Sequence, residues 1–131
     1  MSSYDAEVMA RQLAQLGRDL QDEVMHLGEL EEESVNAEGR FRVKEYALDD
    51  AIDKAFLSSD GSVETRKAVA RTTTTSYRTD FQEANLEWNR ARAKVRVQQA
   101  SLSALHKRIE IGRSLLSREK ALLSLGGIGE V

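Results

Sequence analysis

The spacing of apolar residues in the second half of the chain constrains the fold more than any other feature. Apolar residues recur there in alternating steps of three and four, and this repeat of 3.5 residues places them on one stripe of a helix, as in a coiled coil. Among these positions only Gln98 is plainly polar. We therefore predict a long helix with a left-handed supercoil and a core or oligomer seam. The large residues of this seam are Tyr77, Phe81, Trp88, Val95, Leu102, Leu105, Ile109 and Leu116.

The first half of the chain shows the same spacing less regularly. Fifteen positions from Ala6 to Ala55 follow steps of three and four, and twelve of them are apolar. Three glycines interrupt this predicted helix, and each costs roughly 1 kcal/mol relative to Ala in a helix interior. We interpret them as points of close packing against a neighbour or as a bend, with a break near residues 34–40 as the alternative. They are Gly17, Gly28 and Gly39.

One concentrated turn signal, Ser58-Ser59-Asp60-Gly61-Ser62, separates the two halves, and the chain contains no Pro. Asp-Gly favours a turn, and Ser62 can cap a following helix. We predict an all-α fold, a long antiparallel helical hairpin with helices over about 4–57 and 63–123, joined by a turn at 58–62. The four threonines at 72–75 allow a kink because they are β-branched. Residues 1–123 then form a single domain, and the glycine-rich residues 124–131 form a flexible tail.

Charge is distributed unevenly along the chain. The net charge is −3, but residues 1–60 hold 15 acidic and 6 basic side chains, whereas residues 88–120 hold 9 basic and 2 acidic ones. Folding at residue 60 would bring position i close to position 120−i, so acidic flanks of the first helix would face basic flanks of the second. We interpret most of this asymmetry as charge pairing that sets the antiparallel orientation.

The basic residues that such pairing does not absorb are candidates for binding phosphate, because rows of basic side chains neutralise a nucleic-acid backbone. They lie near the turn or face outward on the second helix. Tyr77 and Trp88 are of the type that stacks on bases, but their place on the seam favours a role in the core. The candidate DNA-binding residues are Lys54, Arg66, Lys67, Arg71, Arg90 and Arg96.

The sequence offers few residues of the kinds that enzymes use for catalysis. The chain has no Cys and only two histidines, which the hairpin places out of register. The glutamates around residues 29–33 fit a solvated helix face better than a metal site, and no phosphate loop is present. There is no apolar run long enough to span a membrane and no secretion signal. We expect a cytoplasmic protein that is not an enzyme and has no catalytic residues, metal or cofactor.

Apolar residues also lie beyond the two seams. A lone two-helix hairpin has little core per residue, and a half-buried apolar stripe must be covered. We therefore expect a homo-oligomer. The residues that support this expectation are Val24, Ile52 and Phe56 on the first helix, and Leu86, Val97 and Leu115 on the second.

Several distinctive segments follow one another over roughly residues 35–123. They are Lys54-Ala55-Phe56-Leu57, the Ser/Gly turn, Glu64-Thr65-Arg66-Lys67-Ala68, Tyr77 with Asp80 and Trp88, and Arg108-Ile109-Glu110-Ile111-Gly112-Arg113-Ser114-Leu115. In this order the chain resembles the UvsY-like recombination mediator proteins of tailed bacteriophages. The resemblance implies a ring-forming homo-oligomer that binds single-stranded DNA. It also implies a role in loading a recombinase onto DNA coated by single-strand-binding protein, in an infected bacterial host.

In the family, DNA-binding basic residues lie just before the turn. Lys54 matches one of them, whereas Phe56 and Asp60 stand where further basic residues are expected. Arg66, Lys67 and Arg71 are our own candidates to compensate for this departure. Two hypotheses follow: a recombination mediator that binds single-stranded DNA, or a coiled-coil scaffold or assembly chaperone that binds no DNA.

Overall fold

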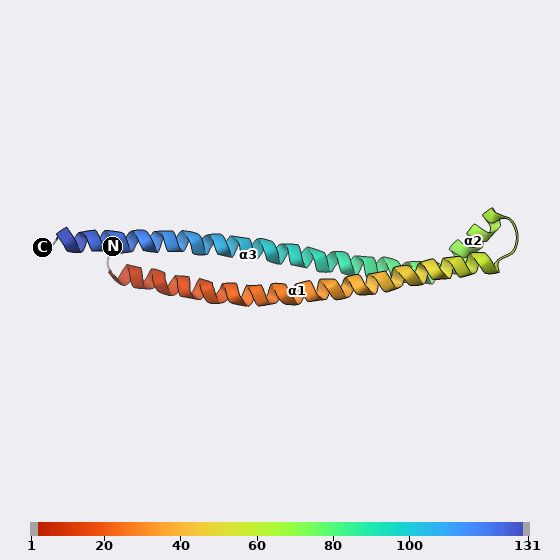
Figure 1. The fold of residues 1–131 in the computed structure, drawn as a ribbon, viewed down its shortest axis with the longest axis horizontal. Helices are drawn as coiled ribbons and strands as arrows, with labels where there is room; N and C mark the ends of the chain where they lie inside the picture. Colours follow the sequence, from red (N-terminus) through yellow and green to blue (C-terminus); the bar gives the residue numbers. More distant parts are fainter. Residues whose placement is uncertain (1–2, 130–131) are drawn as a thin grey trace. The chain divides into compact units, whose positions relative to one another are not determined.

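The computed structural model describes residues 3–129, and these residues form three helices and no strand (Figure 1). Helix α1 spans Ser3–Ser58, α2 spans Val63–Thr73 and α3 spans Thr75–Gly129. The all-α prediction is therefore confirmed. Helix α3 extends past the predicted helix end at residue 123 and includes residues 124–129. Residues 130–131 lie outside the described residues.

The chain packs as two compact units. The terminal unit combines α1 up to Gly28 with α3 from Arg96 onward, and the turn unit spans Glu29–Val95. Because α1 and α3 pack along their length, each core residue contacts residues of its own unit. Helices α1 and α3 each run through both units.

Helices α1 and α3 are antiparallel in the turn unit, as the hairpin prediction requires. Lys94 of α3 pairs with Glu33 of α1 at 3.4 Å, and Glu87 pairs with Arg40 at 3.6 Å. Both pairs lie seven residues farther along α1 than folding at residue 60 predicts, because 120 minus 94 is 26 and 120 minus 87 is 33. The pairing register differs from the prediction because α2 lies beside the α1–α3 pair and is not part of it (Figure 1).

The predicted seam of α3 faces α1 in each unit. Ala84 and Ala91 are buried in the turn unit, and Leu105 and Ile109 are buried in the terminal unit. Tyr77 differs, because it is 45% exposed in the first turn of α3, beside the helix break. The remaining large seam residues are half-buried, namely Phe81, Trp88, Val95, Leu102 and Leu116.

An aromatic cluster forms the centre of the turn unit. Phe41 is buried on the seam of α1, and its ring centroid lies 5.1 Å from that of Phe81 and 5.0 Å from that of Trp88. Both contacts are tilted, an arrangement that aromatic pairs favour. Since the nearby seam positions Ala37, Ala84 and Ala91 are small, these three rings supply much of the apolar volume in this unit.

Gln98, the polar residue of the predicted α3 seam, meets Glu23, one of three polar residues on the seam of α1. Gln98 Nε2 donates a hydrogen bond of 3.0 Å to the Glu23 carbonyl, and Ser101 Oγ donates one of 2.9 Å to the Glu23 carboxylate. Polar side chains in an apolar seam are most stable in a register that gives them hydrogen-bond partners. This pair therefore favours the observed antiparallel register of the terminal unit.

The threonines produce the predicted break, whereas the predicted break at residues 34–40 is absent. Helix α2 ends at Thr73 and α3 begins at Thr75, with Thr74 between them at φ −105° and ψ 17°. The Thr74 hydroxyl donates to the Ala70 carbonyl at 2.6 Å, and Thr72 and Thr73 bond back in the same way. Such bonds compete with the helical ladder and bend helices. In contrast, α1 continues without interruption through Gly39.

The glycines of α1 do not pack closely against a helix of the same chain. An added Cβ at Gly17, Gly28 or Gly39 would meet no atom within 4 Å, so the close-packing interpretation is wrong for contacts within the described chain. Gly112 of α3 is different, because a Cβ there would lie 2.6 Å from Leu13 Cδ2. A side chain at position 112 would therefore have to displace the end of the Leu13 side chain of α1.

This difference between the glycines predicts opposite effects of substitution. We expect Gly112→Val to lower the free energy of unfolding by about 1–3 kcal/mol, because the new side chain must displace Leu13. Gly28→Val is the matched control, and it is expected to raise stability by no more than about 0.5 kcal/mol, from helix propensity alone. Urea denaturation followed by far-UV circular dichroism measures both. Equal and same-sign shifts would contradict the close approach at Gly112.

Candidate phosphate-binding groove

The sequence of α2 presents its basic residues on one side. Ser62 caps the helix by accepting a 3.3 Å hydrogen bond from the Thr65 amide, and Gly61 makes the preceding turn with φ 106°, a value that glycine adopts without strain. Lys67 and Arg71 are four residues apart and so lie on one face of α2. Because Ala70 beside them is buried, this face is turned toward the other helices of the turn unit.

Lys67 and Arg71 line a groove of about 370 Å³ together with residues of α1 and α3. Helix α1 contributes Ile52, Asp53 and Phe56, and α3 contributes Arg78. The guanidinium of Arg78 donates to the Arg71 carbonyl at 3.4 Å, which holds it against the end of α2. The groove thus combines three cationic side chains with one carboxylate over an apolar surface.

Arg66 lies beside this groove and shares its aromatic residue. Its guanidinium carbon is 5.9 Å from the centroid of the Phe56 ring, a cation–π distance. The side chain is half-buried, and its Nε atom is buried without a hydrogen-bond partner among the described residues. Arg66 therefore lies against Phe56, which lines the same groove as Lys67, Arg71 and Arg78.

The structure separates Lys54 from this cluster. Lys54 and Phe56 are two residues apart on α1, so their side chains point about 200° apart around the helix. Lys54 lines a second groove with Ser58, Thr73 and Tyr77. It forms an ion pair of 2.8 Å with Asp50, and the hydrogen bond to that carboxylate raises the pKa of Lys54. Its charge is therefore partly satisfied within α1.

Arg90 and Arg96 also lie away from the groove. Both are exposed on α3, and Arg96 belongs to the terminal unit. Arg90 follows Arg78 by twelve residues, about 18 Å along the helix axis at 1.5 Å per residue. Of the six predicted DNA-binding residues, the structure brings together Lys67 and Arg71, places Arg66 beside them, and leaves the other three elsewhere.

Arg78 and Phe56 line the groove but are not among the six residues predicted to bind DNA. Arg78 follows Arg71 by seven residues, one heptad, but the helix break at Thr74 lies between them. The direction of Arg78 relative to α2 depends on that break, so spacing alone could not show that it would join Lys67 and Arg71.

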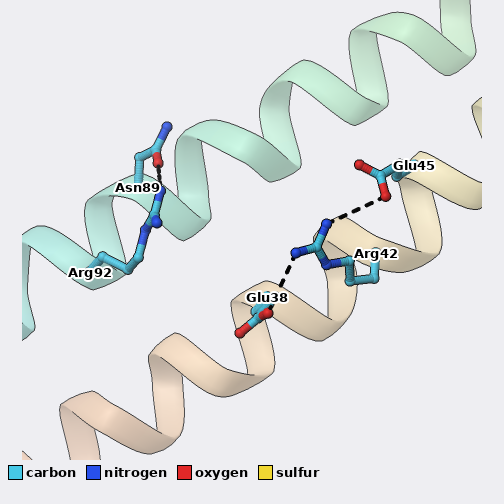
Figure 2. A network of polar contacts seen from close by, with 5 residues as sticks. All are labelled: Glu38, Arg42, Glu45, Asn89 and Arg92. Carbon is cyan, nitrogen blue, oxygen red and sulfur yellow. Dashed lines mark hydrogen bonds and ion pairs between the residues drawn. The ribbon is translucent and has the colours of Figure 1, made fainter.

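Trp88 is occupied by contacts within the turn unit. Its ring packs on Phe41, and the guanidinium carbons of Arg92 and Arg42 lie 4.1 and 5.4 Å from its centroid. Figure 2 shows Arg92 bonded to Asn89 on α3, and Arg42 lying between Glu38 and Glu45 on α1. The half-buried Trp88 ring thus contacts two cations and the buried ring of Phe41, which fits a core residue rather than a base-stacking one.

Charge pairing between α1 and α3 is narrower than the sequence suggests. Lys94 of α3 pairs with Glu33 of α1, whereas in the pair of Glu87 with Arg40 the acidic residue belongs to α3. The basic side chains of α3 from 88 to 120 are exposed. Much of the positive charge of α3 therefore remains at the surface.

The described residues carry no arrangement typical of a metal site or a membrane span. No group of three His, Asp or Glu side chains in that part of the chain is placed to hold a metal ion. None of its helices is both long and apolar enough to cross a bilayer. No family model, curated protein or solved structure matches the chain.

Proposed function

We propose that this protein is a homo-oligomer that binds single-stranded DNA without catalysing a reaction, and that it assists the loading of a recombinase, as its resemblance to recombination mediators implies. The observation that carries the proposal is the groove of the turn unit. There Lys67, Arg71 and Arg78 converge over an apolar surface that offers only Asp53 as an opposing charge.

The composition of the groove suits a single strand better than a duplex. Cationic side chains in a row neutralise successive phosphates. Phe56, flanked by Arg66, supplies an aromatic and apolar surface of the kind on which unpaired bases stack. A duplex hides the faces of its bases, so it can use the cations of the groove but not its apolar surface.

Self-association would add to the affinity of each groove. Three cations and one carboxylate make a weak site in one chain, but several copies held together engage one strand at high effective concentration. Exposed large apolar residues on both long helices support self-association, for example Val35 and Tyr46 on α1 and Ile111 on α3. These same residues favour the second candidate function, a coiled-coil scaffold or assembly chaperone that binds no DNA.

Fluorescence anisotropy with a labelled single-stranded oligonucleotide distinguishes the two candidates. We expect binding at about 50 mM salt. With three phosphate contacts per groove, affinity should fall about twentyfold between 50 and 200 mM salt, from a slope of roughly −0.7 per contact. Absence of binding at low salt would exclude the first candidate, and binding that is independent of salt would contradict phosphate contacts.

Variants of the groove test where the strand binds. We expect the double substitution Lys67→Ala/Arg71→Ala to weaken binding and to make the salt slope shallower by roughly 1.4, because two phosphate contacts are lost. Lys54→Ala/Arg90→Ala is the matched control, because it also removes two positive charges but both lie outside the groove. If this control weakened binding as much as Lys67→Ala/Arg71→Ala, the groove would not be the principal site.

A further inference from the structure

We infer that copies of this chain associate by docking an apolar stripe on α3 of one copy against an apolar stripe on α1 of another, with flanking charges of opposite sign. The inference rests on the self-association within the proposed function and specifies the surfaces responsible. Both stripes lie outside the seams that join α1 to α3, and each belongs to a different unit of the chain.

The stripe on α3, called here the basic stripe, lies in the terminal unit. Its residues follow steps of three, four, three, four and three, so they form one continuous line along the helix. Its apolar members are all exposed, with Ile111 at 61%. An exposed periodic line of large apolar residues differs from the single apolar residues that protein surfaces ordinarily carry. The basic stripe consists of Arg108, Ile111, Leu115, Arg118, Leu122 and Leu125.

The stripe on α1, called here the acidic stripe, lies in the turn unit. Its steps are three, four, four, three and three, and its apolar members are exposed, with Tyr46 at 75%. At its centre a Cβ added to Gly39 would meet nothing within 4 Å, so the backbone is open to close approach. The acidic stripe consists of Glu32, Val35, Gly39, Val43, Tyr46 and Asp49.

The charges of the two stripes are complementary. Acidic residues stand at both ends of the acidic stripe, whereas arginines stand at the start and in the middle of the basic one. Arg108 and Arg118 are exposed, as are the neighbouring Lys107, Arg113 and Lys120. Opposite charges around an apolar centre steer association and fix which surfaces meet.

A second copy fits the basic stripe better than a nucleic acid does. Phosphates would neutralise its arginines but would leave the four large aliphatic side chains between and beyond them in water. A partner helix with its own apolar line covers those side chains. Docking two basic stripes on each other would bring arginines together, whereas the acidic stripe is present on every copy. The contact is therefore heterologous, joining different surfaces of two identical chains.

Charge reversal tests this pairing through mutual rescue. The first variant is Arg108→Glu/Arg118→Glu and the second is Glu32→Lys/Asp49→Lys. In each variant alone, the two stripes carry the same sign, so we expect the dissociation constant for self-association at about 50 mM salt to rise at least tenfold. In an equimolar mixture, the altered stripes face each other with opposite signs, and association should return. Sedimentation velocity measures the mass, and circular dichroism verifies that helicity is retained.

Several outcomes would overturn the inference: a monomeric wild type, a variant that associates like the wild type, or a mixture that stays dissociated. It would also be overturned if Arg108→Glu/Arg118→Glu lost oligonucleotide binding while its mass stayed that of the wild type, which would assign the basic stripe to nucleic acid. Failure of the proposed function is separate. If the wild type associates and mutual rescue succeeds but the oligonucleotide does not bind, DNA binding fails and the pairing stands.

Discussion

Replacing Phe41 with alanine is expected to lower the free energy of unfolding by about 3–5 kcal/mol, the range for removing a buried aromatic side chain. Phe41 is 7% exposed and touches the rings of both Phe81 and Trp88. Alanine would leave a cavity between two rings whose other neighbours on the seams are small, so the surrounding chain has few groups with which to fill it. Such a loss is a large fraction of the 5–15 kcal/mol typical of a whole domain.

Trp88 provides the readout for this variant. As the only tryptophan of the chain, it reports on the aromatic cluster through its fluorescence during urea denaturation. Leu57→Ala is the control, because Leu57 is exposed in the same unit and its removal should change stability by no more than about 0.5 kcal/mol. A shift of under 1 kcal/mol for Phe41→Ala would contradict the assignment of the core of the turn unit to the aromatic cluster.

Replacing Ile109 with alanine is expected to lower stability by about 2–5 kcal/mol, and to do so mainly in the terminal unit. Ile109 is 4% exposed on the seam of α3. The two units have separate cores, so opening of one need not open the other to the same extent. Amide hydrogen exchange should therefore quicken most in α1 up to Gly28 and in α3 beyond Arg96.

Val97→Ala is the control in the same unit. Val97 lies one residue from the polar seam position of α3 and is 70% exposed, so its truncation should leave exchange rates close to those of the wild type. If Ile109→Ala accelerated exchange equally over both units, their stabilities would be coupled. If Val97→Ala matched Ile109→Ala, the seam would not be the source of stability.

Local features of the sequence were enough to predict the helices and the turn between them. The 3.5-residue repeat from Phe81 to Leu116 marks the face of α3 that meets α1, since side chains on one stripe of a helix must share one environment. Asp60-Gly61 and the cap at Ser62 place the turn, because a positive φ and an unsatisfied amide are properties of a few neighbouring residues. The Thr74 break follows from β-branched residues whose hydroxyls compete with the helical ladder.

Predictions that depended on distant contacts were less successful. The glycines of α1 gave no signal to distinguish them from Gly112, although Gly112 closely approaches another helix and Gly17, Gly28 and Gly39 do not. The pairing register was seven residues off at Lys94 and Glu87, because the path of α2 changes which residues meet. Helicity beyond residue 123 was missed because glycine lowers helix propensity, whereas Leu123 continues the seam and is half-buried.

The candidate groove was also predictable in part from local spacing and in part only from tertiary contacts. Sequence spacing alone placed Lys67 and Arg71 on one face of α2, since residues four apart on a helix are neighbours whatever the rest of the chain does. Only the tertiary structure decided that Arg78 and Phe56 would join them and that Lys54 would not. The reason is that these residues come from three helices, and the directions in which α2 leaves the turn and α3 leaves Thr74 depend on packing that no local pattern encodes.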